Sequence, residues 1–362
     1  MRANVTEMLE LHEPQDAFRQ IEDWLRARGF FVAGGEELVA DLYLGYGLSQ
    51  SIRRISAPPP PEPCRALPLA ACRIRQLPRV EQYVAEDCRV GDWEQTWAAA
   101  EYEAAVERVR DAIAQGDVYQ VNLVQHLCAP FAGDPGALAA IFAPLRPRHS
   151  SPFFGNRWAV VSASPELFLA RRGERVWTMP IKGTRPLGAA AELLGSEKDA
   201  AEHVMIVDLE RNDLARICKA GSVRWPELMA ARELTGVEHM VSTVEGELRD
   251  GVGLAEILEA TFPGGSVTGA PKIAAVDLIA ELEPVGRGAS MGALGTVYGN
   301  GDFDLTLTIR TFAVADGTIH LWVGGGVVWD SDPAGELEES WTKARPLLEA
   351  IGSRMPEPVA SP

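Results

Sequence analysis

Residues 293–328 read ALGTVYGNGDFDLTLTIRTFAVADGTIHLWVGGGVV, and this stretch indicates the fold class. It contains three runs that are rich in β-branched, aromatic and other apolar residues, at 293–298, 303–314 and 318–328. The sequences Asn300-Gly301-Asp302 and Asp316-Gly317 lie between these runs and are typical of turns. Short apolar runs joined by such turns predict antiparallel hairpins. We therefore expect an α+β fold and not a βαβ array.

Outside this stretch, apolar residues at helical spacing alternate with further strand-like runs. The helices expected from this spacing are 17–28, 102–114, 193–214, 254–261 and 333–351. Two more strands are expected at 118–127 and 158–162. We interpret the chain as a short divergent N-terminal region at 1–95 with a proline-rich loop at 57–63, a catalytic domain at 96–355, and a frayed tail at 356–362.

The composition is that of an acidic globular protein, with 34 basic and 51 acidic residues, a formal net charge of −17 and a pI near 4.9. This charge argues against nucleic acid and anionic membranes as partners, because phosphate groups bind basic surfaces. No run of about 18 apolar residues that could span a membrane is present. The five cysteines follow no disulfide or metal-ribbon spacing. We expect reduced thiols and a cytoplasmic location.

Lys182 lies in a proline-bounded loop of sequence PIKGTRP, residues 180–186. Gly183 beside it leaves backbone N–H groups accessible to a ligand oxygen. The lysine could be a nucleophile, a substrate clamp or a solvated surface residue. As a nucleophile it must lose a proton, which costs about 4.6 kcal/mol at pH 7 from an unperturbed pKa near 10.4. Burial or a neighbouring cation such as Arg185 would have to lower this pKa.

Carboxylates occur at two places where helices are expected. Glu202 shares an otherwise apolar helix face, and a carboxylate there is costly unless it is paired, binds a metal or reaches solvent. Glu336, Glu339 and Lys343 are spaced to lie on one face of the last helix, either as a site or as a solvated ion pair. Oxygen ligands without a His or Cys cluster favour Mg²⁺ over zinc.

Two glycine-rich segments predict close contact with an anion. The triple glycine at 324–326 would weaken a strand, which indicates close backbone approach there. Residues 261–272, TFPGGSVTGAPK, include Thr268 and Gly269 and form a second candidate anion pocket. The sequence is not a Walker A motif, because Ala-Pro-Lys follows the last glycine. Arg310 and Lys343 would suit an acidic substrate.

Together these segments resemble the chorismate-utilising enzymes. The matching blocks follow in order through the last 250 residues or so, at 116–123, 164–168, 180–186, 202–214, 239–242, 261–272, 309–311, 324–331 and 336–343. The resemblance implies the chorismate-binding fold seen in component I of anthranilate synthase, with two packed β-sheets and flanking helices.

The resemblance also implies site residues. It places Mg²⁺ at Glu202 and Glu339, and the spacing adds Glu336 as a further metal-ligand candidate. The positions assigned to chorismate are Gly183, Thr184, Thr268, Gly269, Ser290, Arg310, Gly324, Gly325, Gly326 and Lys343. Ser290 occupies a position that is usually aromatic in the family.

Lys182 resembles the family branch that forms aminodeoxychorismate, whereas the anthranilate-forming branch has alanine there. The implied reaction is attack of Lys182 on C2 of chorismate, departure of the C4 hydroxyl with a proton from Glu166, and entry of ammonia at C4. His239 is a further catalytic candidate. Gln120 stands where isochorismate-forming members have a lysine base, which disfavours that reaction. Anthranilate synthesis and an inactive chorismate binder stay open as alternatives.

The source of ammonia is expected to be another protein. The sequence has no cysteine in a Gly-x-Cys-x-Gly elbow of the kind that a glutaminase uses. We therefore expect a separate glutamine amidotransferase subunit, and a product that leads to 4-aminobenzoate and folate.

Overall fold

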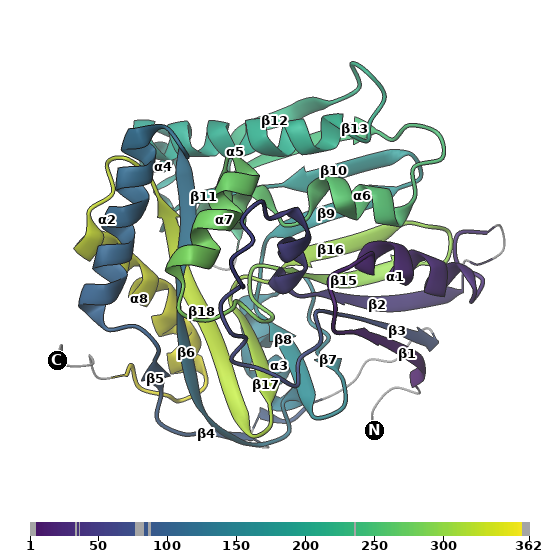
Figure 1. Cartoon of the computed structure of the whole chain (residues 1–362), viewed down its shortest axis with the longest axis horizontal. Helices are drawn as coiled ribbons and strands as arrows, with labels where there is room; N and C mark the ends of the chain where they lie inside the picture. Colours follow the sequence, from purple (N-terminus) through teal and green to yellow (C-terminus); the bar gives the residue numbers. More distant parts are fainter. Residues whose placement is uncertain are drawn as a thin grey trace.

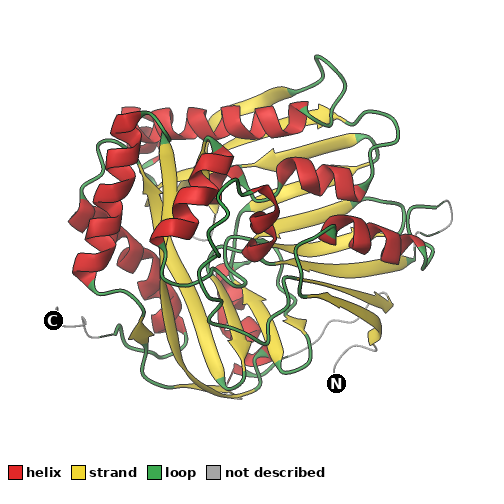
Figure 2. Cartoon of the chain, viewed as in Figure 1, coloured by secondary structure: helices red, strands yellow, loops and turns green. Residues whose placement is uncertain are grey.

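Two antiparallel β-sheets dominate the computed structural model, which describes residues 5–32, 35, 37–76, 83–85, 88–234 and 237–356 (Figures 1 and 2). The larger sheet has the order β1 (Val5–Leu11), β3 (Ala70–Gln76), β2 (Leu38–Leu44), β15 (Ala293–Tyr298), β16 (Phe303–Leu307), β9 (Leu167–Arg172), β10 (Arg175–Met179), β13 (Val237–Glu247) and β11 (Ile181–Pro186), and β12 (Arg224–Leu234) pairs with β13. The smaller sheet has the order β14 (Gly269–Ala270), β6 (Gln120–Gly133), β18 (Thr318–Val327), β17 (Thr311–Ala315), β8 (Trp158–Ser162) and β7 (Phe153–Phe154), and β4 (Cys88–Val90) and β5 (Glu94–Gln95) pair with β6. The expected α+β fold with two packed sheets is confirmed.

Helices flank both sheets (Figure 2). They are α1 (Ala17–Arg26), α2 (Ala99–Gln115), α3 (Gly136–Phe142), α4 (Ala190–Leu194), α5 (Glu197–Ala215), α6 (Leu254–Thr261), α7 (Lys272–Leu282) and α8 (Pro333–Ala350), with 3₁₀ turns η1 (Tyr46–Ile52), η3 (Ala143–Leu145) and η4 (Gly265–Val267). Helix α5 packs on β13 of the larger sheet, and α8 packs on β18 of the smaller one (Figure 1). None of the described helices is both long and apolar enough to cross a membrane.

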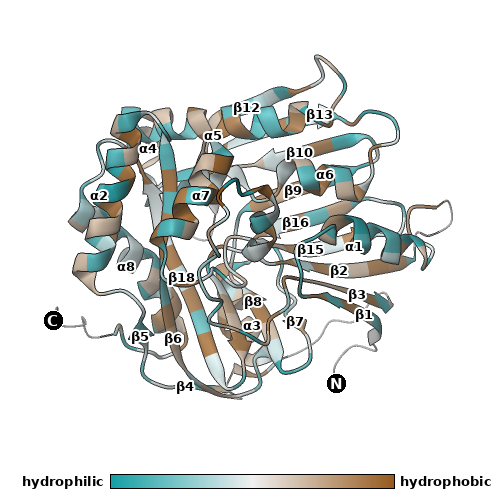
Figure 3. Cartoon of the chain, viewed as in Figure 1, coloured by the Kyte–Doolittle hydropathy of each residue, from teal (hydrophilic) through white to brown (hydrophobic). Residues whose placement is uncertain are grey.

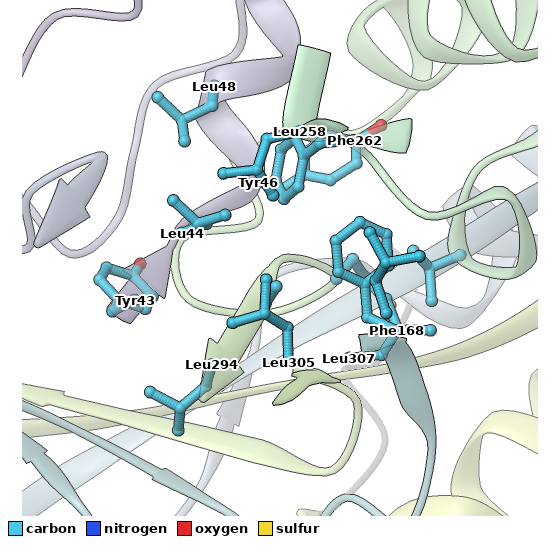
Figure 4. Close-up of a cluster of buried hydrophobic side chains, with 14 of the residues drawn as sticks. Tyr43, Leu44, Tyr46, Leu48, Phe168, Leu258, Phe262, Leu294, Leu305 and Leu307 are labelled. Carbon is cyan, nitrogen blue, oxygen red and sulfur yellow. The ribbon is translucent and has the colours of Figure 1, made fainter. Parts of the chain in front are cut away.

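The main hydrophobic core contains residues of both sheets. Figure 4 shows part of it, with Leu305 of β16 between Leu294 of β15 and a group that includes Leu258 of α6 and Phe262. A second cluster lies on the other face of the smaller sheet, where Leu321 of β18 packs with side chains of α8. Because successive strand residues point to opposite faces, β18 contributes to both clusters. Hydrophobic and hydrophilic stretches accordingly follow one another along β6 and β18 (Figure 3).

The helix expected at 193–214 is divided into α4 and α5, so its predicted continuity is wrong. Gly195 follows the last residue of α4, and glycine is among the weakest helix formers. Ser196 then caps α5, because its side-chain oxygen accepts a hydrogen bond from the backbone N–H of Asp199 at 3.3 Å.

The strand expected at 303–314 is also divided, because the chain leaves one sheet for the other. Residues of β16 pair in the larger sheet and residues of β17 pair in the smaller one. Arg310 lies between them with φ of 49°, a left-handed conformation that ends an extended strand. Both halves are strand-like and were expected as one strand, although the apolar residues change from odd positions up to Ile309 to even positions from Phe312.

A second crossing lies directly beside the first. The chain passes from β8 in the smaller sheet to β9 in the larger one through 163–166, which includes Glu166. The backbone N–H of Ala163 donates to the carbonyl of Arg310 at 3.0 Å, and that of Leu307 donates to the carbonyl of Glu166 at 3.0 Å. The two crossings therefore hold Glu166 and Arg310 in fixed backbone positions.

The remaining expected elements agree with the structure within a few residues at each end, as for α1, α2, α6, α8, β8, β15 and β18, whereas the strand expected at 118–127 runs six residues further, as β6. The domain boundary near residue 95 stays a prediction, although β2 from the first region pairs directly with β15. The proline-rich loop contacts the main body, because Pro61 accepts a hydrogen bond from the N–H of Gly286 at 2.9 Å. Residues 357–362 of the expected tail lie outside the described part of the chain.

Candidate active site

Lys182 of β11 is only partly exposed and is not a solvated surface lysine. Its side chain is 12% exposed, and Nζ lies 2.6 Å from Oε1 of Glu202 on α5. Gln120 of β6 donates a second hydrogen bond to the same carboxylate oxygen at 2.8 Å. The strand register shifts between Lys182 and Thr184, which marks a bulge at Gly183. Gly183 has φ of 64°, a backbone conformation that residues with a side chain rarely adopt. Two sheets and one helix thus meet at this lysine.

The Lys182–Glu202 pair is ionised in the structure. Burial opposes charge on Lys182, but the carboxylates of Glu202 and Glu166 outweigh it and raise the lysine pKa. Burial likewise opposes ionisation of Glu202, but the Lys182 ammonium holds the pKa of that carboxyl below its usual range. A nucleophilic role for Lys182 therefore requires that this pair separate when substrate enters.

The glycines of β18 let carboxylates and amides approach the strand. A Cβ on Gly326 would lie 2.1 Å from Nε2 of Gln120 and 2.8 Å from Oε1 of Glu202. A Cβ on Gly324 would lie 1.9 Å from the carbonyl oxygen of Leu123. Any side chain at these two positions would displace β6 or the Glu202 group. The predicted close approach at the triple glycine is confirmed.

Helix α8 presents the second group of charges. Lys343 Nζ lies 2.8 Å from Oε1 of Glu339 and 2.8 Å from the carbonyl oxygen of Gly324, to which it donates. The Lys343 charge lowers the pKa of Glu339. Glu336 is buried, and its Oε1 accepts a hydrogen bond from Ser331 at 2.6 Å. The spacing on one helical face is as expected.

The carboxylates of α5 and α8 provide oxygen ligands of the kind that bind Mg²⁺. A Cβ on Gly325 would lie 3.2 Å from Oε1 of Glu339 and 3.3 Å from Oε2 of Glu336, so both reach the strand. Oε2 of Glu336 is buried and has no hydrogen-bond partner. Within the described residues, no three His, Cys, Asp or Glu side chains are grouped as a metal site, and lysines pair with Glu202 and Glu339. Carboxylate oxygens without nitrogen or sulfur ligands fit a hard cation.

Glu166 lies at the crossing beside Arg310. Its carboxyl is 5% exposed and accepts a hydrogen bond from Ser266 at 2.9 Å. Burial raises the pKa of Glu166 above its usual range, although Ser266 and the charges of Lys182 and Arg310 act in the opposite direction. Glu166 is thus an acid that can hold a proton close to Lys182.

His239 of β13 is oriented by the bulge at Gly183. Its Nδ1 lies 3.1 Å from the carbonyl oxygen of Gly183 and 3.1 Å from Oγ1 of Thr184. Because a carbonyl only accepts, Nδ1 carries the proton, and Nε2 is the acceptor nitrogen. Nε2 is buried without a partner. Burial lowers the pKa of His239, so the neutral ring is available to accept a hydrogen bond.

Three residues that are assigned to the substrate make contacts with the backbone of this chain. Thr268 donates through Oγ1 to the carbonyl of Gly264 at 2.8 Å, inside its own loop. A Cβ on Gly269 would lie 2.1 Å from the carbonyl oxygen of Gln120, so this glycine permits β14 to pair with β6. Ser290 is fully buried and donates to the carbonyl of Thr308 at 3.3 Å. Their assignment to chorismate stays a prediction.

Sequence reasoning used Gln120 only to disfavour isochorismate formation and missed Ser266 and Ser331, although all three bind a predicted carboxylate. For Gln120 a signal existed, since it and Asn122 are polar residues two apart in an apolar strand and so share one face. For the two serines, no spacing in the sequence links them to their partners. Their contacts depend on loops that only the fold brings together.

The site lies within residues 61–349, which match the family model described as chorismate binding enzyme, and the chain belongs to this family. It is 44% identical over 262 residues to anthranilate synthase component 1 of Thermus thermophilus, an alignment that covers 69% of this chain and 56% of that protein. It is 38% identical over 290 residues to aminodeoxychorismate synthase component 1 of Bacillus subtilis, with 77% of this chain and 61% of that protein covered.

A solved structure confirms the expected fold. The crystal structure of anthranilate synthase component I from Streptococcus pneumoniae TIGR4 superimposes with a TM-score of 0.82 and 25% sequence identity, covering 95% of this chain and 90% of that one. The chain spans 56% and 61% of the length of the two curated relatives named above.

Proposed function

We propose that this chain converts chorismate and ammonia to 4-amino-4-deoxychorismate, with Lys182 as the nucleophile. The observation that carries this proposal is the position of Lys182. Its amine is buried, points to Glu202 at the junction of the two sheets, and lies close enough to Glu166 for their charges to interact. A lysine that only bound substrate electrostatically would not need to be buried between two carboxylates.

The proposed reaction balances with these residues and solvent. Lys182 first gives one proton to solvent, which it takes back at the end. Its neutral amine forms a bond to C2 of chorismate, the ring π electrons shift, and the C4–O bond breaks. The leaving oxygen takes the proton of Glu166 and departs as water. Ammonia then forms the C4–N bond and gives a proton to Glu166, the π electrons shift back, and the C2–N bond breaks to restore Lys182. The net change replaces hydroxyl by amine.

The other site residues bind and orient. Mg²⁺ would be held by Glu202 and Glu339, with Glu336 as a further ligand. When bound, the ion supplies positive charge that orients a substrate carboxylate and polarises the ring beside it. Arg310 and Lys343 supply positive charge for the carboxylates of chorismate, and Nε2 of His239 accepts a hydrogen bond.

Ammonia is proposed to come from a separate glutamine amidotransferase subunit. The relatives are named as component 1 of their synthases, and the partner would be the other component. Free ammonium at high concentration would replace it in the test tube.

Anthranilate synthesis is the second candidate, because the relative with 44% identity is an anthranilate synthase component 1. The two reactions differ in the fate of the enolpyruvyl group, which is released as pyruvate only when anthranilate forms. Lys182 would then be dispensable.

The test is direct identification of the product. The purified chain is mixed with chorismate, Mg²⁺ and ammonium at mildly alkaline pH, and products are separated and identified by mass. Aminodeoxychorismate without pyruvate supports the proposal. Anthranilate with an equal amount of pyruvate contradicts it, and so does chorismate that stays intact even when a glutamine amidotransferase is added with glutamine.

A further inference from the structure

Arg310 differs from the two lysines of the site in what holds its side chain. Lys182 and Lys343 form ion pairs with Glu202 and Glu339. The guanidinium of Arg310 is partly buried and makes no hydrogen bond or ion pair with any of the described residues. Its direction therefore depends on the backbone at the crossing between β16 and β17.

The backbone of Arg310 has a conformation that arginine rarely adopts. Its φ of 49° is left-handed, and in this region the Cβ of an L-residue comes too close to the following carbonyl oxygen. A residue with a side chain stays in such a conformation only when its surroundings fix it. One contact that does so is a hydrogen bond from the N–H of Ala163 to the carbonyl of Arg310, at 3.0 Å.

Two buried hydroxyl groups provide further contacts beside Arg310. Thr311 is fully buried, and its Oγ1 reaches back past Arg310 to donate to the carbonyl of Ile309 at 2.9 Å. Ser162 of β8 is 5% exposed and lies opposite Thr311 in the sheet, with 2.8 Å between the two hydroxyl oxygens. Because a carbonyl only accepts, the one hydrogen of the Thr311 hydroxyl goes to Ile309, and Ser162 donates to Thr311.

The hydrogen bonds continue from this hydroxyl pair into the second crossing. Ser162 Oγ accepts a hydrogen bond from the N–H of Ser164 at 3.2 Å, and Ser164 Oγ accepts one from the N–H of Glu166 at 3.3 Å. Both hydroxyls of the Thr311–Ser162 pair thus have partners, and buried polar groups that are fully satisfied make a structure rigid. Removal of either hydroxyl would leave the other without its partner.

A simpler role for the hydroxyl pair would be to join β8 to β17. Threonine and serine that face each other on neighbouring strands often form such a hydrogen bond. The bond from Thr311 to Ile309 has a different position, because it lies within one segment of the chain and spans Arg310. It adds nothing to the pairing of the two strands, and its effect falls on the conformation of Arg310.

We propose that Thr311 and Ser162 are positioning residues for Arg310: their paired hydroxyls hold the left-handed turn of the chain at Arg310 and so fix the direction in which its guanidinium meets a carboxylate of the substrate. This inference rests on the proposed function for the role of Arg310. A guanidinium without other partners can donate two parallel hydrogen bonds to one carboxylate, and that contact requires a fixed orientation. Thr311 and Ser162 act through Arg310 and do not touch the substrate.

The test measures KM and kcat from the consumption of chorismate, with Mg²⁺ and ammonium at fixed concentrations. Thr311→Val removes the hydroxyl and keeps the shape of the side chain. We expect its KM for chorismate to rise by about 10-fold and its kcat to change much less, because the carboxylate is bound in the ground state and the transition state alike. Thr311→Ser retains the hydroxyl and is expected to restore most of this loss.

Thr296→Val is the matched control for the loss of a buried threonine hydroxyl. Thr296 of β15 is 7% exposed, and its strand partners Asp304 and Asp41 both belong to the larger sheet. Its KM for chorismate is expected to stay at the wild-type value, even if the variant unfolds at a lower temperature. A KM in Thr311→Val equal to that of Thr296→Val overturns the inference, as does a KM in Thr311→Ser as high as in Thr311→Val.

A double-mutant cycle shows whether Thr311 acts through Arg310. Arg310→Gln removes the charge, keeps a long side chain, and is expected to raise KM for chorismate by itself. Thr311→Val added to Arg310→Gln is then expected to leave KM where Arg310→Gln has it, because no guanidinium is left to misplace. A further rise of about 10-fold in the double variant, which is what independent effects would give, overturns the inference.

Ser162→Ala tests the same pair if Thr311→Val does not fold. It removes the donor to Thr311 and is expected to raise KM in the same direction but by less, because Thr311 keeps its bond to Ile309. A wild-type KM in folded Ser162→Ala overturns the role of the pair.

These comparisons of KM do not depend on the product that forms. A wild-type product other than aminodeoxychorismate therefore contradicts the proposed function alone. If chorismate is not consumed, dissociation constants from calorimetric titration with chorismate and Mg²⁺ replace KM, with the same expected ratios.

Discussion

The site has two sides that the chain builds in different ways. On one side Glu166 and Arg310 lie where the backbone crosses between the two sheets, and backbone hydrogen bonds join the crossings. On the other side Glu202 and Glu339 project from α5 and α8, and lysines pair with both. Burial raises the pKa of Glu166, whereas the lysine charges lower the pKa of Glu202 and of Glu339. The carboxyl on the crossing side can therefore hold a proton, whereas the carboxylates on the helical side are negatively charged.

Because of this difference, the glutamate carboxyls on the two sides are suited to different chemistry. A buried carboxyl without a paired cation is suited to hold and donate a proton, as proposed for Glu166, which accepts a hydrogen bond from Ser266. Ionised carboxylates beside lysines are suited to a cation. Lys182 on β11 lies between the two sides, because the charges of both Glu202 and Glu166 act on it.

The largest effect is expected where the two sides meet. Lys182→Ala removes the proposed nucleophile and is expected to lower kcat for aminodeoxychorismate formation by at least about 10³-fold. Lys182→Arg is the matched control for charge, because guanidinium preserves the ion pair with Glu202 but cannot form the bond to C2. Both variants are expected to be inactive in product analysis by mass. Wild-type rates in Lys182→Ala would rule out the covalent route.

Loss of a helical-side carboxylate is expected to have the next largest effect. Glu339→Gln removes a proposed Mg²⁺ ligand without a change in side-chain length, and its apparent Mg²⁺ affinity is expected to fall by about 10- to 100-fold. The adjacent Glu338→Gln is the control, since that side chain is 67% exposed and pairs with Arg345 on the surface. Activity is measured across a Mg²⁺ titration. If both variants saturate at the wild-type Mg²⁺ concentration, Glu339 is not a ligand.

The helical side could be predicted from the sequence because helices have a fixed period. The spacing of Glu336, Glu339 and Lys343 places them on one face, and the structure has them there. The triple glycine likewise predicted that other groups approach the strand closely. Glycine weakens a strand, and it is often found where another backbone or a ligand comes close. Local spacing therefore predicted how these residues lie relative to one another, and their role as a site stays a prediction.

The crossing side could not be predicted in this way. The apolar residues of 303–314 change from odd to even positions beside Arg310, but this change of phase does not show that the chain moves to another sheet. The hydrogen bond from Ser266 to Glu166 joins residues 100 positions apart in sequence. Glu166 was assigned with the family resemblance and Arg310 from its charge, and the geometry of both depends on tertiary pairing.

A substitution in β18 is expected to perturb the helical side by steric contact. In Gly326→Ala the new methyl would approach Gln120 and Glu202 within contact distance, so the Lys182–Glu202 pair must shift. We expect kcat/KM for chorismate to fall by about 10-fold or more. Gly335→Ala is the control, since Gly335 is exposed on α8 and the nearest atom to a Cβ is 3.3 Å away on Asp332. Equal kcat/KM in the two variants would contradict the close approach.

The smallest effect concerns the turn that leads to Ser290 on the crossing side. Glu62 of the proline-rich loop accepts a hydrogen bond from the N–H of Gly288 at 3.0 Å, and burial raises its pKa to about 7. The folded chain therefore binds this proton more tightly than the unfolded chain does. The resulting stabilisation is present below about pH 4.5 and is lost as the pH rises to about 7.

Glu62→Gln removes this titration and retains an oxygen that can accept from Gly288. The variant is expected to be more stable than wild type at pH 8, by on the order of 2 kcal/mol in the free energy of unfolding, and to approach wild type at pH 5. Urea unfolding at the two pH values measures this difference. Glu259→Gln, at an exposed position on α6, serves as the control and is expected to show no such pH dependence. A stability difference for Glu62→Gln that is equal at pH 5 and pH 8 would mean that the Glu62 carboxyl does not hold its proton more tightly in the folded chain.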